Sequence, residues 1–239
     1  MKLHIGTSGW SYPGWRQRFY PPEIRPDGWL EFYARHFDTV EINMTFYRSP
    51  KPETLHNWAA RTPENFVFTM KASRQITHLK KLQKVEHDLE HLAFLARQLG
   101  PKMGCLLYQL PPSLTRDKEL LASFLQVLPP GFKQVLEFRH PSWYHPEIYE
   151  LMSQFGTIFC VVSSARVPPE VVVTSRTAYF RFHGLTGGYR YRYSDDELKK
   201  WAEAIRRAAA EECFVYFNND YQAHAVFNAQ KLRELLTAA

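Results

Sequence analysis

Eight short segments of this chain have the length and the β-branched or aromatic content that are typical of β-strands. They span residues 3–7, 39–43, 66–71, 104–110, 134–139, 157–162, 178–183 and 213–218. Most of them are separated by segments with a helical spacing of apolar residues, at 29–37, 54–61, 85–100, 118–128, 146–156, 195–212 and 228–239. This alternation predicts a parallel sheet, because neighbouring strands that run in the same direction need long crossover connections, which are usually helices.

The number of repeats narrows the fold further. Eight strand segments within 239 residues favour an α/β fold of the TIM type, a closed (β/α)8 barrel. The alternative is a doubly wound open α/β sheet, which has the same alternation without closure. The sequence contains neither a shift in composition nor a long linker rich in Gly, Ser or Pro, so residues 1–239 are predicted to form a single domain.

Charge and composition limit the environment and the partners of the chain. The formal net charge of +6 at pH 7 favours anionic partners, but no run of five or more basic residues indicates a nucleic-acid-binding tail. All three cysteines lie within apolar runs, which predicts buried, reduced thiols. The first ten residues contain no apolar signal segment, and the chain has no stretch of 18 apolar residues. A cytoplasmic protein without a membrane partner is therefore expected.

Polar side chains gather at the carboxyl ends of several predicted strands. Within residues 134–139, Leu136 and Phe138 share one face and Glu137 and Arg139 share the other, because side chains alternate along a strand. In a barrel the second face points inward, and the carboxyl ends form the mouth where active sites are built. The same reasoning predicts a ring of polar groups at this mouth, namely Glu41, Asn43, Lys71, Gln109, Glu137, Arg139, Arg181, His183 and Asn218.

This ring has two interpretations. It could fill the barrel as a structural plug of salt bridges, or it could line a ligand pocket, because buried charges are costly unless they are paired or in contact with a polar ligand. We favour the pocket, since the charges cluster at one end of several strands rather than along their whole length.

Glu41, Glu137 and His183 are the predicted catalytic residues. Two carboxylates can divide acid and base roles, and a histidine can exchange protons near neutral pH. The neighbouring cations would hold the carboxylates ionised and would suit a carboxylate or phosphate ligand. We therefore predict a small anionic ligand, such as one that bears a phosphate, with acid–base or hydrolytic chemistry. No cofactor is predicted; a divalent metal held by the three catalytic candidates is chemically allowed, but the Arg and Lys side chains oppose it.

Three alternative functions stay open. Residues 184–193 interleave Tyr and Arg after three glycines, a pattern that could grip nucleic acid in a binding protein or a metal-dependent phosphodiesterase. Glu41 and Glu137, with Trp10 and Trp143 as stacking partners, could form the carboxylate pair of a glycosidase. The protein could also be a non-catalytic scaffold.

Motifs spread over the whole chain include GTSGWSYPGW at 6–15, VEINMTFYR at 40–48, LEFRHPSW at 136–143 and FRFHG at 180–184. Together they resemble the motifs of the domain-of-unknown-function 72 (DUF72) family, also called YecE-like proteins. The resemblance implies a TIM barrel, which agrees with the strand and helix alternation. It implies no activity, because the family is named for lacking one.

The positions that match these motifs complete the set of predicted ligand-binding residues. The set comprises Ser8, Trp10, Asn43, Tyr47, Lys71, His78, Gln109, Arg139, His140, Trp143, Arg181, Asn218 and Asn219. The chain departs from the family at one place, because members usually carry an acidic residue after the sixth strand, where this chain has Ser163 and Ser164. The departure weakens any role that needs that carboxylate, including metal binding.

Overall fold

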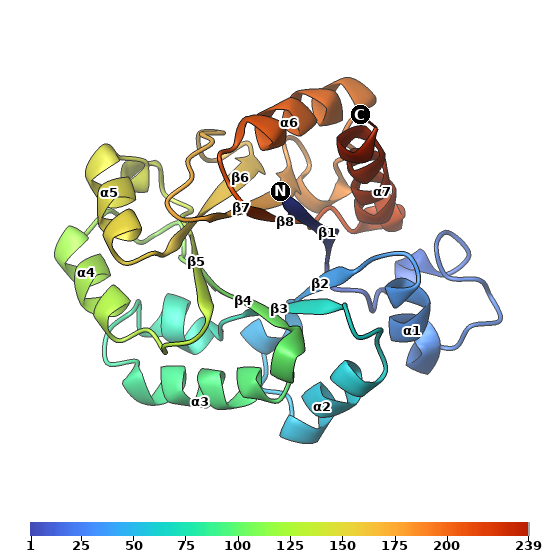
Figure 1. The fold of residues 1–239 in the computed structure, drawn as a ribbon, viewed down its shortest axis with the longest axis horizontal. Coiled ribbons are helices and arrows are strands. Elements are labelled where there is room, and N and C mark those ends of the chain that lie inside the picture. Colours follow the sequence, from blue (N-terminus) through green and yellow to red (C-terminus); the bar gives the residue numbers. More distant parts are fainter. Residues whose placement is uncertain (239) are drawn as a thin grey trace.

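The computed structural model describes residues 1–238, which contain a closed barrel of eight parallel strands (Figure 1). Each strand pairs with its neighbours in the sequence, and β1 pairs with β8 to close the barrel. Closure confirms the predicted TIM-type barrel and excludes the open sheet. The strands are β1 (Lys2–Ser8), β2 (Thr39–Ile42), β3 (Val67–Lys71), β4 (Met103–Gln109), β5 (Lys133–Glu137), β6 (Ile158–Ser164), β7 (Thr177–Gly184) and β8 (Glu212–Phe217).

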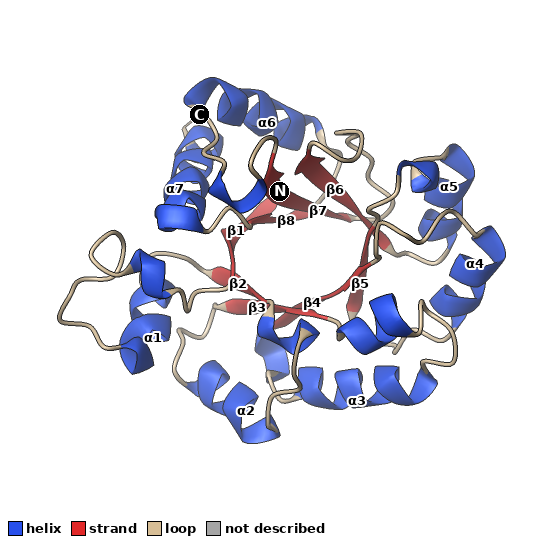
Figure 2. Cartoon of the chain, turned by 180° about the vertical axis from the view of Figure 1, so that it is seen from behind, coloured by secondary structure: helices blue, strands red, loops and turns tan. Residues whose placement is uncertain are grey.

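Helices form an outer layer around the strands (Figure 2). Those of residues 1–238 are α1 (Trp29–Ala34), α2 (Pro52–Ala60), α3 (Glu86–Arg97), α4 (Lys118–Gln126), α5 (Pro146–Gln154), α6 (Asp195–Arg207) and α7 (His224–Thr237). Within the same residues, β6 is followed by a loop at 165–176 instead of an α-helix. None of the described helices combines the length and the apolar character needed to cross a membrane.

The strands bury both of their faces. On the outer face, Phe138, Phe180 and Phe182 belong to a core cluster that also contains helix residues such as Leu198. The inner face forms a second cluster, whose members include Cys105, Leu107, Val135, Cys160, Val162, Tyr179, Phe214 and Tyr216. The predicted alternation of faces is confirmed, and the barrel interior beneath the mouth is filled by apolar and aromatic side chains.

Buried thiols are part of this filling. Cys105, Cys160 and Cys213 are all free and buried, as the apolar runs predict. Burial raises the pKa of each thiol, so the reactive thiolate form is disfavoured. The three cysteines therefore act as small apolar residues of the core.

The start of α6 shows how the sequence defines a helix end. Ser194 Oγ accepts a hydrogen bond from the Glu197 backbone N–H, and the Glu197 carboxylate accepts one from the Ser194 backbone N–H, which is a capping box. The helix ends at Arg207, although the sequence predicts that it extends to residue 212. It stops early because Ala208 adopts an extended conformation, which turns the chain towards β8.

Candidate functional site

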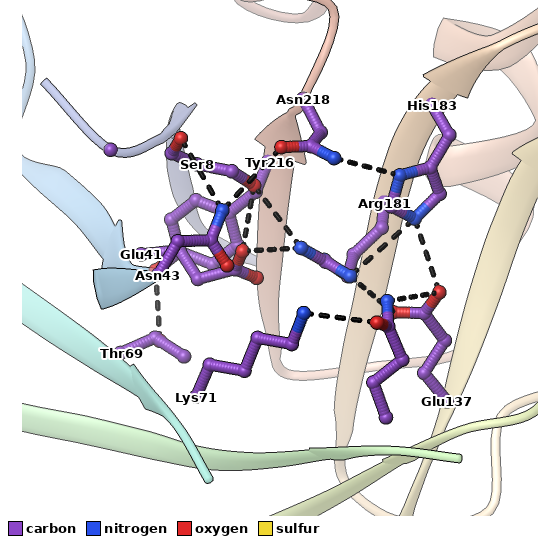
Figure 3. A network of polar contacts seen from close by, with 12 residues as sticks. Ser8, Glu41, Asn43, Thr69, Lys71, Glu137, Arg181, His183, Tyr216 and Asn218 are labelled. Carbon is purple, nitrogen blue, oxygen red and sulfur yellow. Dashed lines mark hydrogen bonds and ion pairs between the residues drawn. The ribbon is translucent and has the colours of Figure 1, made fainter. Parts of the chain in front are cut away.

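One arginine and two glutamates are in contact below the mouth of the barrel (Figure 3). Arg181 Nη2 donates to Glu41 Oε2 at 2.6 Å, and Arg181 Nη1 pairs with Glu137 Oε2. All three side chains are fully buried. Glu41 also accepts hydrogen bonds from Ser8 Oγ at 2.6 Å and from the Tyr179 hydroxyl at 2.7 Å. We call Glu41, Arg181 and Glu137 the buried triad.

The guanidinium of Arg181 determines what the two carboxylates can do. It lies between them and uses a separate nitrogen for each. Burial alone would raise the pKa of Glu137, but Arg139, Arg181 and His183 hold it well below its usual value. The triad is therefore a charge-paired structural unit, and Glu137 is not free to donate a proton.

A second layer of polar side chains covers the triad and reaches partly into solvent. We call it the outer tier: Asn43, Lys71, Gln109, Arg139, His183 and Asn218. Asn43, Arg139 and His183 each come two positions after a triad residue in the sequence. Each therefore lies about 6.6 Å further along the direction of its strand than that triad residue. The Arg139 guanidinium also pairs with Glu137 and keeps 18% of its side chain exposed. Gln109 Nε2 donates to both Glu137 oxygens at 3.0 Å.

His183 is held in one protonation form. Asn43 Nδ2 donates to Asn218 Oδ1 at 3.4 Å, which orients the Asn218 amide so that its Nδ2 donates to His183 Nδ1 at 3.1 Å. His183 Nε2 lies 2.9 Å from Arg139 Nη2, which can only donate, and 3.1 Å from Glu137 Oε1, which accepts. Burial and the adjacent Arg139 cation lower the pKa of His183 to about 3. At neutral pH His183 is therefore uncharged, with both ring nitrogens in contact with protein groups.

Lys71 is the group of the mouth that titrates near neutral pH. Its side chain is buried, with 8% of the residue exposed. Lys71 Nζ donates to Gln109 Oε1 at 2.9 Å and lies 4.1 Å from the centroid of the Phe46 ring. Within residues 1–238 no carboxylate lies within ion-pair distance of it. Burial, reinforced by Arg181, lowers the pKa of Lys71 to about 7.

Two further predicted residues lie beside Lys71, in contact with the same Phe46 ring. His78 packs its ring edge-to-face on Phe46 at 4.9 Å, and Tyr47 does so at 5.0 Å. Tyr47 is 76% exposed, so it forms the outer edge of this wall. Burial and the Lys71 charge lower the pKa of His78.

A cleft of about 570 Å³ opens next to the outer tier. We call it the lateral cleft. Asn43 belongs to both, and its Oδ1 is buried with no hydrogen-bond partner in residues 1–238. Trp10 and Trp58 meet edge-to-face in the lining, with ring centroids 4.9 Å apart. The lining residues are Gly9, Trp10, Ser11, Tyr12, Pro26, Asp27, Leu30, Ile42, Asn43, Met44, Tyr47, Arg48, Trp58 and Arg61.

Three further predicted residues also lie outside the outer tier and the lateral cleft, and they contact loops or helices around the mouth. His140 Nδ1 accepts from the Ser142 backbone N–H at 3.2 Å, so it caps the short turn that follows β5. Trp143 is fully buried, and its Nε1 donates to the Leu114 carbonyl at 2.7 Å. Asn219 donates to the loop after β7 and to α7. These side chains hold loops of the mouth in place instead of lining its surface.

The structure adds residues that the sequence interpretation did not select. Tyr179 bonds Glu41 from below, and the Tyr216 hydroxyl lies 2.6 Å from Thr39 Oγ1 and 3.0 Å from Thr69 Oγ1. Strand alternation already indicates that both tyrosines face inward. Phe46 carries no such signal, because it lies in a short turn after β2.

The basic and aromatic loop after β7 is largely engaged in its own packing. Tyr193 is buried, and the Tyr191 hydroxyl donates to Glu197 at 2.5 Å. The Arg190 guanidinium lies 5.7 Å from the centroid of the Tyr189 ring. Two of the three loop tyrosines therefore serve the fold.

No additional carboxylate reaches the mouth from β6. Ser163 Oγ accepts from the Tyr193 hydroxyl at 2.9 Å, and Ser164 Oγ accepts from the Arg166 backbone N–H at 3.3 Å. Across residues 1–238, no group of three or more His, Cys, Asp or Glu side chains could hold a metal ion. The position between Glu41 and Glu137 is occupied by the Arg181 cation.

Comparisons with known proteins agree with the motifs. Residues 4–239 match the family model described as protein of unknown function DUF72. YunF of Bacillus subtilis is 28% identical over 271 residues, which cover 98% of this chain and 94% of that protein. YecE of Escherichia coli K12 is 33% identical over 143 residues, 59% of this chain and 50% of that protein. The crystal structure of a DUF72 family protein from Thermotoga maritima superimposes with a TM-score of 0.89 and 30% identity, and the match covers 99% of each chain. The chain belongs to the DUF72 family of proteins of unknown function.

Proposed function

We propose that the protein binds a small anionic ligand at the mouth of the barrel, on the outer tier. The observation that carries this proposal is an excess of cationic side chains. Arg139 and Arg181 neutralise Glu41 and Glu137, which leaves Lys71 without a carboxylate partner among the described residues. A bound anion would supply the missing counter-charge.

Hydrogen-bonding groups around Lys71 support the same proposal. Arg139 is partly exposed, and the unpartnered Oδ1 of Asn43 is able to accept a hydrogen bond from a ligand hydroxyl or amine. The lateral cleft of about 570 Å³ next to Asn43 has the size of a typical small-molecule site. A ligand whose anionic group contacts Lys71 and whose apolar part packs against Trp10 would use both the cationic group and the lateral cleft.

The geometry favours this function over the alternatives. A glycosidase needs free space between its two carboxylates for the sugar, and Arg181 fills that space. A divalent cation held by the same carboxylates would have to displace that guanidinium. Nucleic-acid binding loses its main support, because Tyr191 and Tyr193 are engaged within the fold. For acid–base chemistry, Lys71 replaces His183 as the candidate, because its pKa of about 7 permits proton exchange near neutral pH.

Calorimetric titration with sulfate tests the anion site. Lys71→Gln removes the excess cation, whereas the matched control Lys2→Gln removes a charge at the opposite end of the barrel. At constant ionic strength the affinity for sulfate is expected to fall about tenfold or more in Lys71→Gln, which corresponds to one lost charge-assisted contact. The control is expected to bind like the wild type. Binding should also weaken between pH 6 and pH 8.5, as Lys71 loses its proton. Equal affinities in all three proteins, or no binding to the wild type, would contradict the proposal.

A further inference from the structure

The environment of Lys71 differs from that of every other lysine in residues 1–238, because it is the one that is buried. Lysine is a strongly hydrated cation, and burial without a carboxylate partner disfavours its charged form. Among the residues that the structure describes, its single hydrogen-bond partner is the neutral amide of Gln109. The position therefore favours a neutral amine with a free electron pair.

Charged neighbours act on this amine from several elements. The cations come from β7 (Arg181) and from the segment after β5 (Arg139). The carboxylates come from β2 (Glu41) and β5 (Glu137), and the turn after β3 contributes the His78 ring. Arg181 has the largest effect of these charges on the Lys71 pKa, and it acts in the same direction as burial. A pKa of about 7 leaves about half of the amine neutral at pH 7, compared with about 0.04% for an ordinary exposed lysine.

Two contacts fix the direction of the Lys71 side chain. Gln109 Oε1 accepts from Nζ, while the other end of the same amide donates to both oxygens of Glu137. The Phe46 ring lies against Nζ at 4.1 Å and excludes water from that side. A neutral amine that is anchored and largely dehydrated, in a residue that keeps 8% of its surface exposed, is suited to nucleophilic attack on a carbonyl carbon.

We propose that Lys71 forms a Schiff base with a small anionic aldehyde or ketone. In the first step the electron pair of Nζ forms a bond to the carbonyl carbon, and one Nζ proton moves to the carbonyl oxygen. In the second step the C–O bond breaks, and the oxygen leaves as water with the second Nζ proton. The products are the imine and one water molecule, so no oxidant or reductant is required.

This inference rests on the proposed anion site, because Arg139 is the partly exposed cation that would hold the anionic group of the ligand. The rival explanation is that Lys71 acts only as an ammonium group that attracts an anion. The two explanations differ in chemistry, since an ammonium group forms no covalent bond to a carbonyl compound.

Reductive trapping on the full chain distinguishes them. The protein is incubated at pH 7 with glyoxylate, a small anionic aldehyde, and sodium cyanoborohydride, and the modified lysines are identified by peptide mass spectrometry. Lys71 is expected to gain a carboxymethyl group at least about tenfold faster than Lys199, an exposed lysine of α6, because more of its amine is neutral. Sulfate is expected to slow the modification of Lys71 and to leave that of Lys199 unchanged.

Each other outcome removes one of the two proposals. If Lys71 reacts no faster than Lys199 while sulfate still binds, the Schiff base is excluded and the anion site stands. If Lys71 reacts fast but sulfate gives no protection, the reactive amine stands and the anion site fails. All rates are compared within the wild-type chain, so the result does not depend on whether a Lys71 variant folds.

Discussion

Arg181 pairs with two buried carboxylates inside the barrel. In residues 1–238 it is the only ion-pair partner of Glu41. Arg181→Met is expected to lower the free energy of unfolding by about 3–5 kcal/mol, because a buried carboxylate loses its counter-charge. Urea denaturation of the variant and the wild type measures this loss.

The matched control for this prediction is Lys71→Met, which removes a different buried cation from the same mouth. Because Lys71 has no carboxylate partner among the described residues, its removal leaves no carboxylate unpaired. The control is expected to change the free energy of unfolding by less than about 1 kcal/mol, as a substitution that strands no charge. Equal losses in Arg181→Met and Lys71→Met would show that the triad has no special role in stability.

The residues of the mouth could be predicted from strand alternation as one ring, and the structure divides this ring into two depths. Glu137 lies in the buried triad, and Arg139, two positions later on the same face, lies in the outer tier. The plug interpretation of the polar ring applies to the triad, which is a set of ion pairs covered by the outer tier, and the pocket interpretation of the outer tier stays a proposal. The pairing itself depends on the register between distant strands, which no local pattern encodes. For the same reason the contact between Lys71 and Phe46 could not be predicted.

The loop after β7 is held by a hydrogen bond to the first turn of α6. The capping box of Ser194 and Glu197 starts this helix, and Glu197 also accepts the hydrogen bond of the Tyr191 hydroxyl in the loop. Ser194→Ala is expected to lower the free energy of unfolding by about 1 kcal/mol, the usual effect of losing a cap. Chemical denaturation checks this value. Ser123→Ala is the control, since Ser123 lies within α4 and bonds only the preceding turn. A loss no larger than that of the control would mean that the cap does not stabilise α6.

The order of the elements could be predicted because strands and helices have different apolar periods. The connections between them could not. His140 and Trp143 follow β5 in the sequence, and the sequence places them at the mouth, yet one caps a turn and the other is buried beneath the loops. The lateral cleft lies between the segments after β1 and β2, whose paths depend on aromatic packing such as that of Trp10 on Trp58.

Protonation of buried groups is expected to make the whole fold sensitive to acid. The pKa of His183 is lowered from 6.5 to about 3, so the unfolded chain binds a proton in this range that the folded chain does not. Stability therefore falls as the pH decreases from 6.5 towards 3. The lowered pKa of Glu137 adds a further loss below pH 4.5, where the unfolded chain takes up a proton and the folded chain does not.

His183→Gln isolates the first of these contributions. Urea denaturation at constant ionic strength between pH 7 and pH 4.5 is expected to show a shallower loss of stability in this variant than in the wild type. Some loss remains, because burial also lowers the pKa values of His4, His78 and His224. His87→Gln is the control, since His87 is exposed on α3, and it is expected to keep the wild-type slope. If His183→Gln lost stability as steeply as the wild type, His183 would not be held neutral in the folded protein.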